Sequence, residues 1–176
     1  LGKLVDEEGR IQIPGFYDEV IELDQREREQ FAALPFSEDK FKQQLGIDEI
    51  HGEAGFTTLE RRWARPTCDL NGIWGGYQGE GAKTVLPGRA GAKFSFRLVP
   101  AQDPEKIQAA VKQFLEDALP AGIRMEFIHH HGAPGVVVDL NSPYMSAAAA
   151  AIEQGFGKPP VFIREGGSMP VVSAFR

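Results

Sequence analysis

The segment 93–99 constrains the fold of this chain more than any other part of its sequence. Apolar and polar residues alternate along it, with Phe94, Phe96 and Leu98 on one side and Lys93, Ser95 and Arg97 on the other. Successive side chains of a β-strand point to opposite faces of the sheet, so this alternation predicts a strand with one buried and one accessible face. Sheets with one open face are usually antiparallel, and we therefore expect an antiparallel sheet.

The residues on either side of this strand predict further strands and two helices. Asp103 is a suitable capping carboxylate and Pro104 fits the first helical position, so a helix is expected to begin there. Its apolar stripe comprises Ile107, Val111, Phe114, Leu115 and Ala118. Ser142 predicts the start of a second helix over 144–154, with Gly155 in the stop position. Strands are expected over 67–76, 123–131, 136–140 and 161–163. This order predicts an α+β fold, a two-layer sandwich with helices on one face of an antiparallel sheet.

The first 65 residues have a helical character instead. Their apolar spacing predicts helices over 17–34, 37–45 and 57–64. Ser37 is expected to cap the second helix, and Pro66 to stop the third because the residue before a proline disfavours the helical conformation.

Composition and charge argue against several classes of function. The 176 residues carry a formal net charge of −6, whereas nucleic acids and acidic membranes favour clustered Lys and Arg. No apolar run approaches the roughly 20 residues that are needed to span a bilayer. Cys68 is the only cysteine, so no internal disulfide can form. We therefore expect a cytoplasmic protein without nucleic-acid or membrane partners.

Two segments carry residues that suit the binding of an anion. The segment 164–168 combines an arginine, two glycines and a serine where a helix is expected to begin, and the N–H groups of a helix start attract a carboxylate or phosphate. A serine-capped helix after a tight turn explains the same residues equally well. Arg97 has a planar guanidinium that can hold a carboxylate with two hydrogen bonds. Taken alone, an arginine in this position is more often an ordinary surface residue.

The run His129, His130 and His131 suggests a metal site. Neighbouring side chains on a strand point to opposite faces, so at most His129 and His131 could share an ion. Zinc usually needs a third or fourth ligand, and the sequence offers none nearby. We therefore expect no metal site within this chain, whereas a single histidine in contact with a substrate fits better.

Three stretches together resemble one family. They are 81–87 (GAKTVLP), 93–100 (KFSFRLVP) and 164–170 (REGGSMP). In this order and spacing they are similar to the aminoacylase/carnosinase-type metallopeptidases, most of all to the branch of cytosolic nonspecific dipeptidases. The segment 4–15 resembles an insertion that is typical of that branch. The resemblance covers nearly the whole chain, and the motifs are specific only jointly.

The resemblance implies a fold and an activity. In this family, a catalytic domain binds two metal ions, zinc or manganese, and an inserted lid domain of ferredoxin-like topology forms the dimer and grips the substrate. The chain would then comprise a helical insertion (1–65), most of the lid or dimerisation domain (66–158) and a return segment to the catalytic domain (159–176). The first strand and first helix of the lid would be missing.

By motif position, the resemblance also implies a set of substrate-binding residues. These are Thr84, Arg97, His131, Glu165, Gly167 and Ser168. Thr84 and Arg97 would hold the carboxylate end of a dipeptide or an acylated amino acid. Gly167 and Ser168 would form an anion-binding turn, and Glu165 would lie near the other end of the substrate. In the family's homodimers some of these contacts, including that of Thr84, would come from the second subunit.

The family's metal ligands and catalytic base have no recognisable counterpart in this sequence. The ligands are a His-x-Asp pair, a Glu-Glu pair, a further Asp and a late His, and the base is the first Glu of the Glu-Glu pair. We therefore assign no catalytic and no metal-binding residue to this chain, and expect it to be inactive alone. The alternative is a non-catalytic module that binds a small acid or forms dimers.

Overall fold

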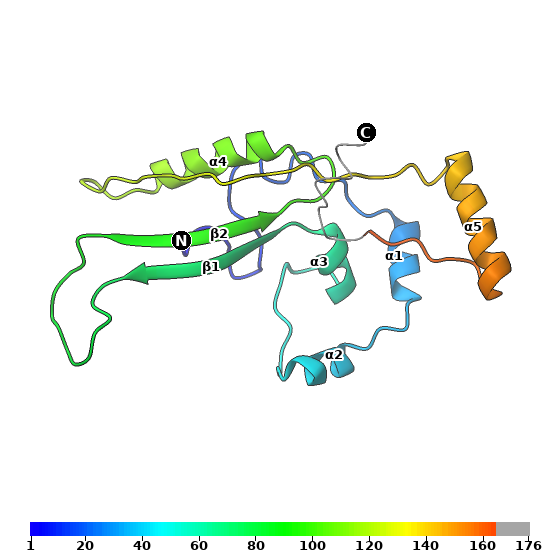
Figure 1. Cartoon of the computed structure of the whole chain (residues 1–176), viewed down its shortest axis with the longest axis horizontal. Helices are drawn as coiled ribbons and strands as arrows, with labels where there is room; N and C mark the ends of the chain where they lie inside the picture. The colour runs from blue at the N-terminus through cyan, green and yellow to red at the C-terminus, as the bar shows by residue number, and fades with distance from the viewer. Residues whose placement is uncertain (165–176) are drawn as a thin grey trace.

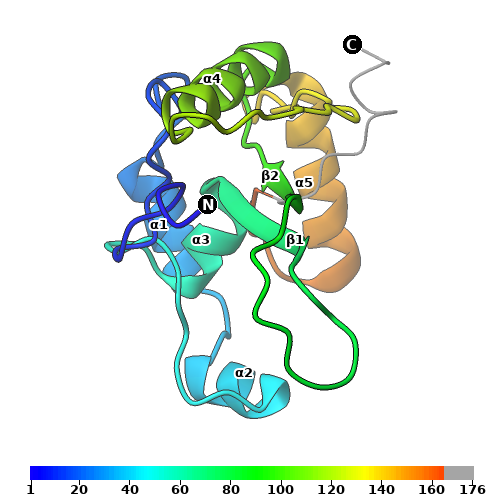
Figure 2. The same cartoon turned by 90° about the vertical axis from the view of Figure 1, so that its left-hand side faces the viewer.

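The computed structural model describes residues 1–164, which form five helices and one two-stranded antiparallel sheet. In chain order these elements are α1 (Gln25–Ala32), α2 (Glu38–Leu45), α3 (Thr58–Ala64), β1 (Thr67–Gly75), β2 (Ala90–Arg97), α4 (Pro104–Asp117) and α5 (Pro143–Phe156). Helix α4 covers one face of the β1–β2 hairpin. Helices α1, α2 and α3 gather near the end of the hairpin where β1 begins and β2 finishes (Figures 1 and 2). The expected α+β class is confirmed.

The β1–β2 hairpin has the alternation that the sequence predicts. Thr67 lies opposite Arg97 and Gly75 lies opposite Ala90, with one irregularity in the register between Leu70 and Gly72. The apolar residues of the alternating segment are half-buried and the polar ones are exposed. Residues 76–89 connect the two strands in a loop that projects beyond the sheet (Figure 1).

The larger core lies between α4 and the inner face of the hairpin. Its buried residues are Leu4, Ile11, Ile13, Phe16, Ile107 and Val111, and partly buried hydrophobic side chains of β1 and β2 pack against them. The N-terminal residues reach this core through a tight turn that is closed by a bridge between Val5 and Ile11. Gly9 lies in this turn with a φ of +77°, and a Cβ there would lie 2.6 Å from the carbonyl carbon of Gly52. Only glycine fits such a position.

A smaller core joins α1 to α3. It consists of Leu23, Phe31, Leu59 and Ala64, and the ring of Trp63 lies edge-on to that of Phe31 at 5.3 Å. Asp24 and Thr57 each form a capping box at the start of α1 and α3. The polar residues at these helix starts therefore fix where α1 and α3 begin.

Two predicted helix boundaries are wrong. Helix α1 begins at Gln25 rather than at residue 17, because Asp24 has extended backbone angles and accepts a hydrogen bond from the Glu27 N–H as the N-cap. Residues 17–23 are apolar at helical spacing, yet they run outside a helix. Helix α5 continues through Gly155 to Phe156, and its C-cap is Gly157, which takes the left-handed conformation.

The structure also contradicts three predicted strands. None of the segments 123–131, 136–140 and 161–163 forms a regular strand. Within residues 1–164 only β1 and β2 form the sheet, so it is a single hairpin rather than the larger sheet that we expected. Met125 and Phe127 are half-buried while Arg124 and Glu126 are exposed, so burial still follows the period of a strand. Within residues 1–164 these segments form no hydrogen-bonded ladder with another strand, which a regular strand requires.

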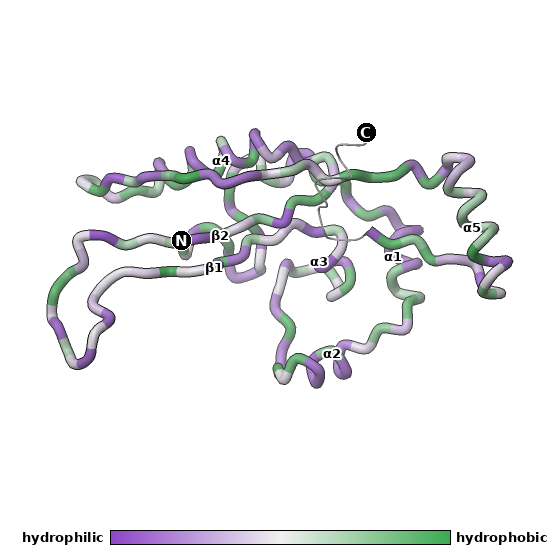
Figure 3. The backbone as a smooth tube through the Cα atoms, in the orientation of Figure 1, coloured by the Kyte–Doolittle hydropathy of each residue, from purple (hydrophilic) through white to green (hydrophobic). Residues whose placement is uncertain are grey.

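The segments on both sides of α5 carry exposed apolar residues. They are Val137, Val138, Leu140, Val161 and Ile163, and the chain there is coloured as hydrophobic in Figure 3. Helix α5 itself has no buried residue. Among the residues that the structure describes, none of the helices has the length and apolar character needed to cross a bilayer.

Candidate substrate-binding site

Arg97 ends β2 on the exposed face of the hairpin. Its neighbour across the ladder is Thr67, whose hydroxyl donates a hydrogen bond of 2.8 Å to the Asp69 carboxylate. Within residues 1–164, Arg97 forms no ion pair. An exposed guanidinium at the end of a strand is well placed to bind a carboxylate in a bidentate manner.

Thr84 lies at the other end of the same hairpin. It is exposed, in the loop of residues 76–89 that joins β1 to β2. Seven residue steps separate Ala90 from Arg97 along β2, a distance of about 23 Å at roughly 3.3 Å per residue. The loop extends away from the strands beyond Ala90 (Figure 1), so one copy of the chain does not bring Thr84 and Arg97 together around a small ligand.

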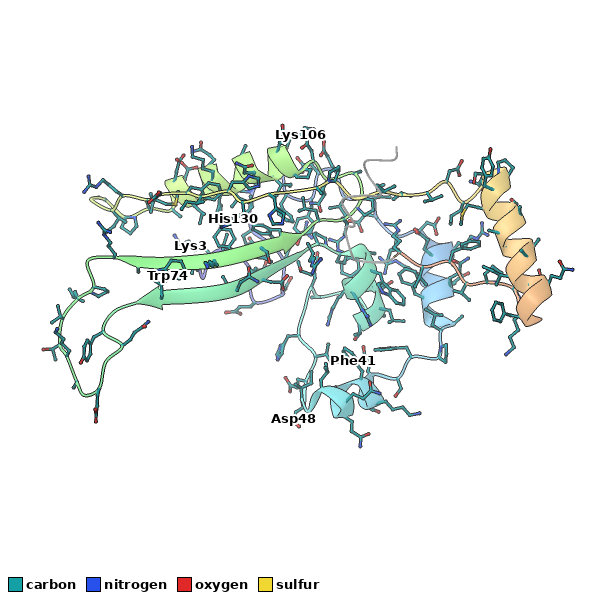
Figure 4. All side chains as sticks on the ribbon, viewed as in Figure 1. Lys3, Phe41, Asp48, Trp74, Lys106 and His130 are labelled. Atoms are coloured by element: carbon teal, nitrogen blue, oxygen red, sulfur yellow. The ribbon has the colours of Figure 1, made fainter. Side chains whose placement is uncertain are left out.

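His131 lies in the extended segment that runs alongside α4. A Cβ at the adjacent Gly132 would lie 2.9 Å from the Cβ of Pro104, and one at Gly135 would lie 3.2 Å from the Cα of Pro100. The chain around His131 therefore passes beside the residues that directly follow Arg97. Figure 4 labels His130 on this segment and Trp74 near the loop end of β1. The structure thus places His131 and Arg97 toward one end of the hairpin and Thr84 at the other.

The histidine run does not form a cluster of metal-binding side chains with its surroundings. His129 lines an open groove with Glu105 and Lys112 of α4. Across residues 1–164, no group of three or more His, Cys, Asp or Glu side chains lies close enough to hold a metal ion. Burial, with a smaller effect of Asp69, raises the pKa of the Cys68 thiol to about 11, so this thiol stays protonated at neutral pH and is a poor nucleophile.

Arg164 is bound by other protein groups. Its Nε and Nη2 donate hydrogen bonds of 2.8 Å to the two carboxylate oxygens of Glu27, and its Nη1 donates one of 2.8 Å to the carbonyl of Ile21. Arg164 thus ties the end of the described chain to the start of α1. Three of the predicted site residues, Glu165, Gly167 and Ser168, lie outside the described residues.

A buried ion pair between Arg65 and Glu53 is the main polar feature that the sequence did not reveal. Nε and Nη2 of Arg65 donate hydrogen bonds of 2.7 Å to the two Glu53 oxygens, and both residues are at most 7% exposed. Burial lowers the pKa of Arg65, but hydrogen bonds to Glu53 and Glu22 outweigh this and raise its pKa overall. From the sequence, Arg65 is recognised only as the residue at which a helix ends before Pro66. No local sequence pattern predicts that it pairs with Glu53, 12 residues away.

Comparison with known proteins places the chain among metallopeptidases. A family model described as a peptidase dimerisation domain matches residues 2–123. The Cys-Gly metallodipeptidase dug1 of Schizosaccharomyces pombe is 32% identical over 99% of this chain and 37% of its own length. The Beta-Ala-His dipeptidase of Homo sapiens is 30% identical over 100% of this chain and 35% of its own length. The chain thus spans little more than a third of the curated relatives that it matches.

Solved structures agree with this assignment. A metallo-carboxypeptidase of the M20 family from Sulfolobus solfataricus matches with a TM-score of 0.78 and 34% identity, over 96% of this chain and 38% of that one. The di-peptidase Dug1p of Saccharomyces cerevisiae matches with a TM-score of 0.72 and 32% identity, over 99% of this chain and 37% of that one. Since the family model matches well over half of its residues, this chain belongs to the M20 peptidase dimerisation domain family.

Proposed function

We propose that this chain is the substrate-binding and dimer-forming portion of a metal-dependent, cytoplasmic dipeptidase that hydrolyses dipeptides with a free carboxylate. The names of the relatives, Cys-Gly metallodipeptidase and Beta-Ala-His dipeptidase, support the substrate class. The observation that carries the proposal is the exposed guanidinium of Arg97 at the end of β2. Acylated amino acids present the same carboxylate and are included in the proposed substrate class.

In this proposal, Arg97 holds the substrate's carboxylate through charge-assisted hydrogen bonds. This charge-assisted contact should contribute about 1.5–3 kcal/mol in all, and a bidentate pair also fixes the orientation of the substrate. His131, on the chain that passes beside the residues after Arg97, contacts the same substrate. The metal ions, two zinc or two manganese ions by the resemblance, would supply activated water for hydrolysis. We assign none of their ligands to this chain, because the ligand motifs of the family have no recognisable counterpart in its sequence.

The proposal includes a homodimer in which Thr84 serves the site of the other copy. One hairpin separates Thr84 from Arg97 by more than the length of a dipeptide, because β2 alone spans about 23 Å. The loop of residues 76–89 projects away from its own body, as it must to reach a second copy (Figure 2). A site built from two copies also explains why a dimerisation domain carries substrate-binding residues.

The test is the Arg97→Ala substitution in the full-length protein. We expect kcat/KM for a dipeptide with a free carboxylate to fall about 10- to 150-fold, and for the same dipeptide amidated at its C-terminus by less than about threefold. Lys93→Ala is the matched control, because Lys93 is an exposed cation on the same face of β2. Equal losses on both substrates would remove Arg97 from the carboxylate site. A full-length protein without dipeptidase activity in zinc or manganese would support the alternative, a module that binds a small acid or only dimerises.

A further inference from the structure

The two strands of the hairpin carry only one acidic residue, Asp69. Their sequences are TCDLNGIWG and AGAKFSFR, so their other charged residues are Lys93 and Arg97. All three side chains are exposed. A single negative charge therefore lies among the strand residues that surround the proposed carboxylate-binding arginine.

Asp69 and Arg97 are diagonal neighbours on the open face of the hairpin. Thr67 lies opposite Arg97 in the ladder, and Asp69 is two residues further along β1. The intervening pair, Cys68 and Phe96, packs against the core, so Asp69 and Arg97 point away from the core. Diagonal neighbours in an antiparallel sheet lie roughly 7–8 Å apart, which is within reach of a long side chain. A group bound to Arg97 is therefore close enough to Asp69 to be influenced by its charge.

Asp69 does not pair with the neighbouring cations. Its Oδ2 accepts the hydrogen bond of 2.8 Å from the Thr67 hydroxyl, and across residues 1–164 it forms no ion pair. Exposed ion pairs gain little, because holding two mobile side chains in one geometry opposes their attraction. The guanidinium of Arg97 and the carboxylate of Asp69 are thus both accessible to a ligand, side by side on one face.

We propose that Asp69 is a specificity-determining residue, which favours substrates whose C-terminal residue has a cationic side chain and disfavours those in which it is acidic. This inference rests on the proposed function, because it takes Arg97 as the residue that binds the substrate's carboxylate. When Arg97 holds that carboxylate, the side chain of the same substrate residue begins next to the open face. An ammonium on a long flexible stem can then reach Asp69, whereas an acidic side chain is repelled by it.

The experiment measures kcat/KM of the full-length protein for Ala-Lys, Ala-Gln and Ala-Glu, three dipeptides that differ only in the C-terminal residue. The wild-type protein should prefer Ala-Lys to Ala-Glu. Asp69→Asn should lower this preference about 5- to 50-fold, as expected for unit charges about 7 Å apart near a protein surface. It should impair hydrolysis of Ala-Lys and improve that of Ala-Glu, and Asp69→Lys should reverse the preference. Asparagine keeps an oxygen that can accept the Thr67 hydrogen bond, so the main change is one of charge.

Asp117→Asn is the matched control, because Asp117 is an exposed acid of α4, which covers the opposite face of the hairpin. It should leave the preference unchanged, and an equal effect of both variants would mean that the net charge of the protein, rather than Asp69, decides the preference. Binding of N-acetyl-lysine and N-acetyl-glutamate, measured by calorimetry, gives a readout without hydrolysis. Asp69→Asn should reduce the difference between these two ligands, and an unchanged difference would refute the inference.

Two further outcomes separate this inference from the proposed function. If the wild-type protein is active but Asp69→Asn lowers kcat/KM equally for all three dipeptides, the effect of Asp69 is structural and only the inference fails. If the wild-type protein hydrolyses none of the three dipeptides with zinc or manganese, the proposed function fails and the inference fails with it.

Discussion

Gln102 holds the turn between β2 and α4 from inside the protein. It is only 2% exposed, its Oε1 accepts a hydrogen bond of 2.9 Å from the Val99 N–H, and its Nε2 donates one of 2.7 Å to the Phe16 carbonyl. The preceding Ala101 has a φ of +73°, which is unfavourable for a residue with a side chain. The buried amide therefore keeps a strained turn in place and joins it to the N-terminal residues.

We expect Gln102→Ala to lower the free energy of unfolding by about 2–4 kcal/mol, because it leaves two buried backbone groups without partners. Gln113→Ala is the matched control. Gln113 is exposed on α4 and its side chain donates a hydrogen bond to the exposed Asp117, so its loss should change stability by less than about 0.5 kcal/mol. Denaturant unfolding of the full-length protein, followed by a probe near this domain, measures the difference. Equal effects of the two substitutions would contradict the role given to Gln102.

At the scale of residues, the sequence predicts which side chains are exposed better than it predicts which side chains form ion pairs with one another. The exposed position of Arg97 follows from a period-two pattern that spans only seven residues. The partners of Arg164 and Arg65 do not follow from any local pattern, because Glu27 lies 137 residues from Arg164. Glu22 precedes Arg26 by four residues, the spacing of a helical ion pair, whereas in the structure it binds Arg65. Ion pairs across the fold depend on packing that the sequence alone does not specify.

Helix α4 is the element that the sequence predicts most closely. Asp103 is its N-cap and accepts a hydrogen bond of 2.9 Å from the Glu105 N–H, and Pro104 is its first residue, as predicted. Ile107 and Val111 of the expected stripe are buried, and Phe114 and Leu115 pack against the same core, whereas Ala118 is exposed. Helix starts depend on contacts within four residues, which explains this agreement.

We expect Asp103→Ala to destabilise the protein by about 1 kcal/mol, since it removes the cap of α4. Asp117→Ala, at the opposite end of the same helix, serves as the control. Removing a negative charge at a helix C-terminus should be neutral or slightly stabilising. Thermal unfolding of the two variants, compared at one pH near neutrality, tests the contrast. A larger loss for Asp117→Ala would mean that the cap does not control the start of α4.

The strands after α4 show where prediction from sequence fails at the scale of elements. Burial alternates at residues 124–127 as it does in a strand, but a strand also needs a second backbone alongside it. Within residues 1–164, this segment forms no ladder with another strand. The predicted strand is therefore absent although the burial of residues 124–127 alternates, because pairing depends on residues far away in the chain.

At the scale of the whole molecule, the site is proposed to need two copies. Mixing Arg97→Ala protein with Thr84→Ala protein under conditions that exchange subunits should restore about one quarter of the wild-type activity. Half of the dimers in a 1:1 mixture contain one copy of each variant. In each such dimer, one of the two sites combines an intact Arg97 with an intact Thr84 from the other copy, so one quarter of all sites are intact.

The restored activity is measured with the free-carboxylate dipeptide, and each variant alone provides the baseline. A mixture with no more activity than the sum of its two components would show that Thr84 acts within its own copy. Mixing Arg97→Ala protein with a second preparation of the same variant controls for effects of the exchange procedure itself.

The length of the hairpin sets a limit on the ligand. An extended peptide that touches Thr84 and Arg97 of one copy would have to exceed the span of β2, about 23 Å, and would need more than about seven residues. A single copy would thus favour oligopeptides, while a site completed by a second copy admits only much shorter ones. Dimer formation would then decide whether the site prefers dipeptides or peptides of about seven residues or more. Conditions that separate the two copies should therefore change which peptides are bound as well as how tightly they are bound.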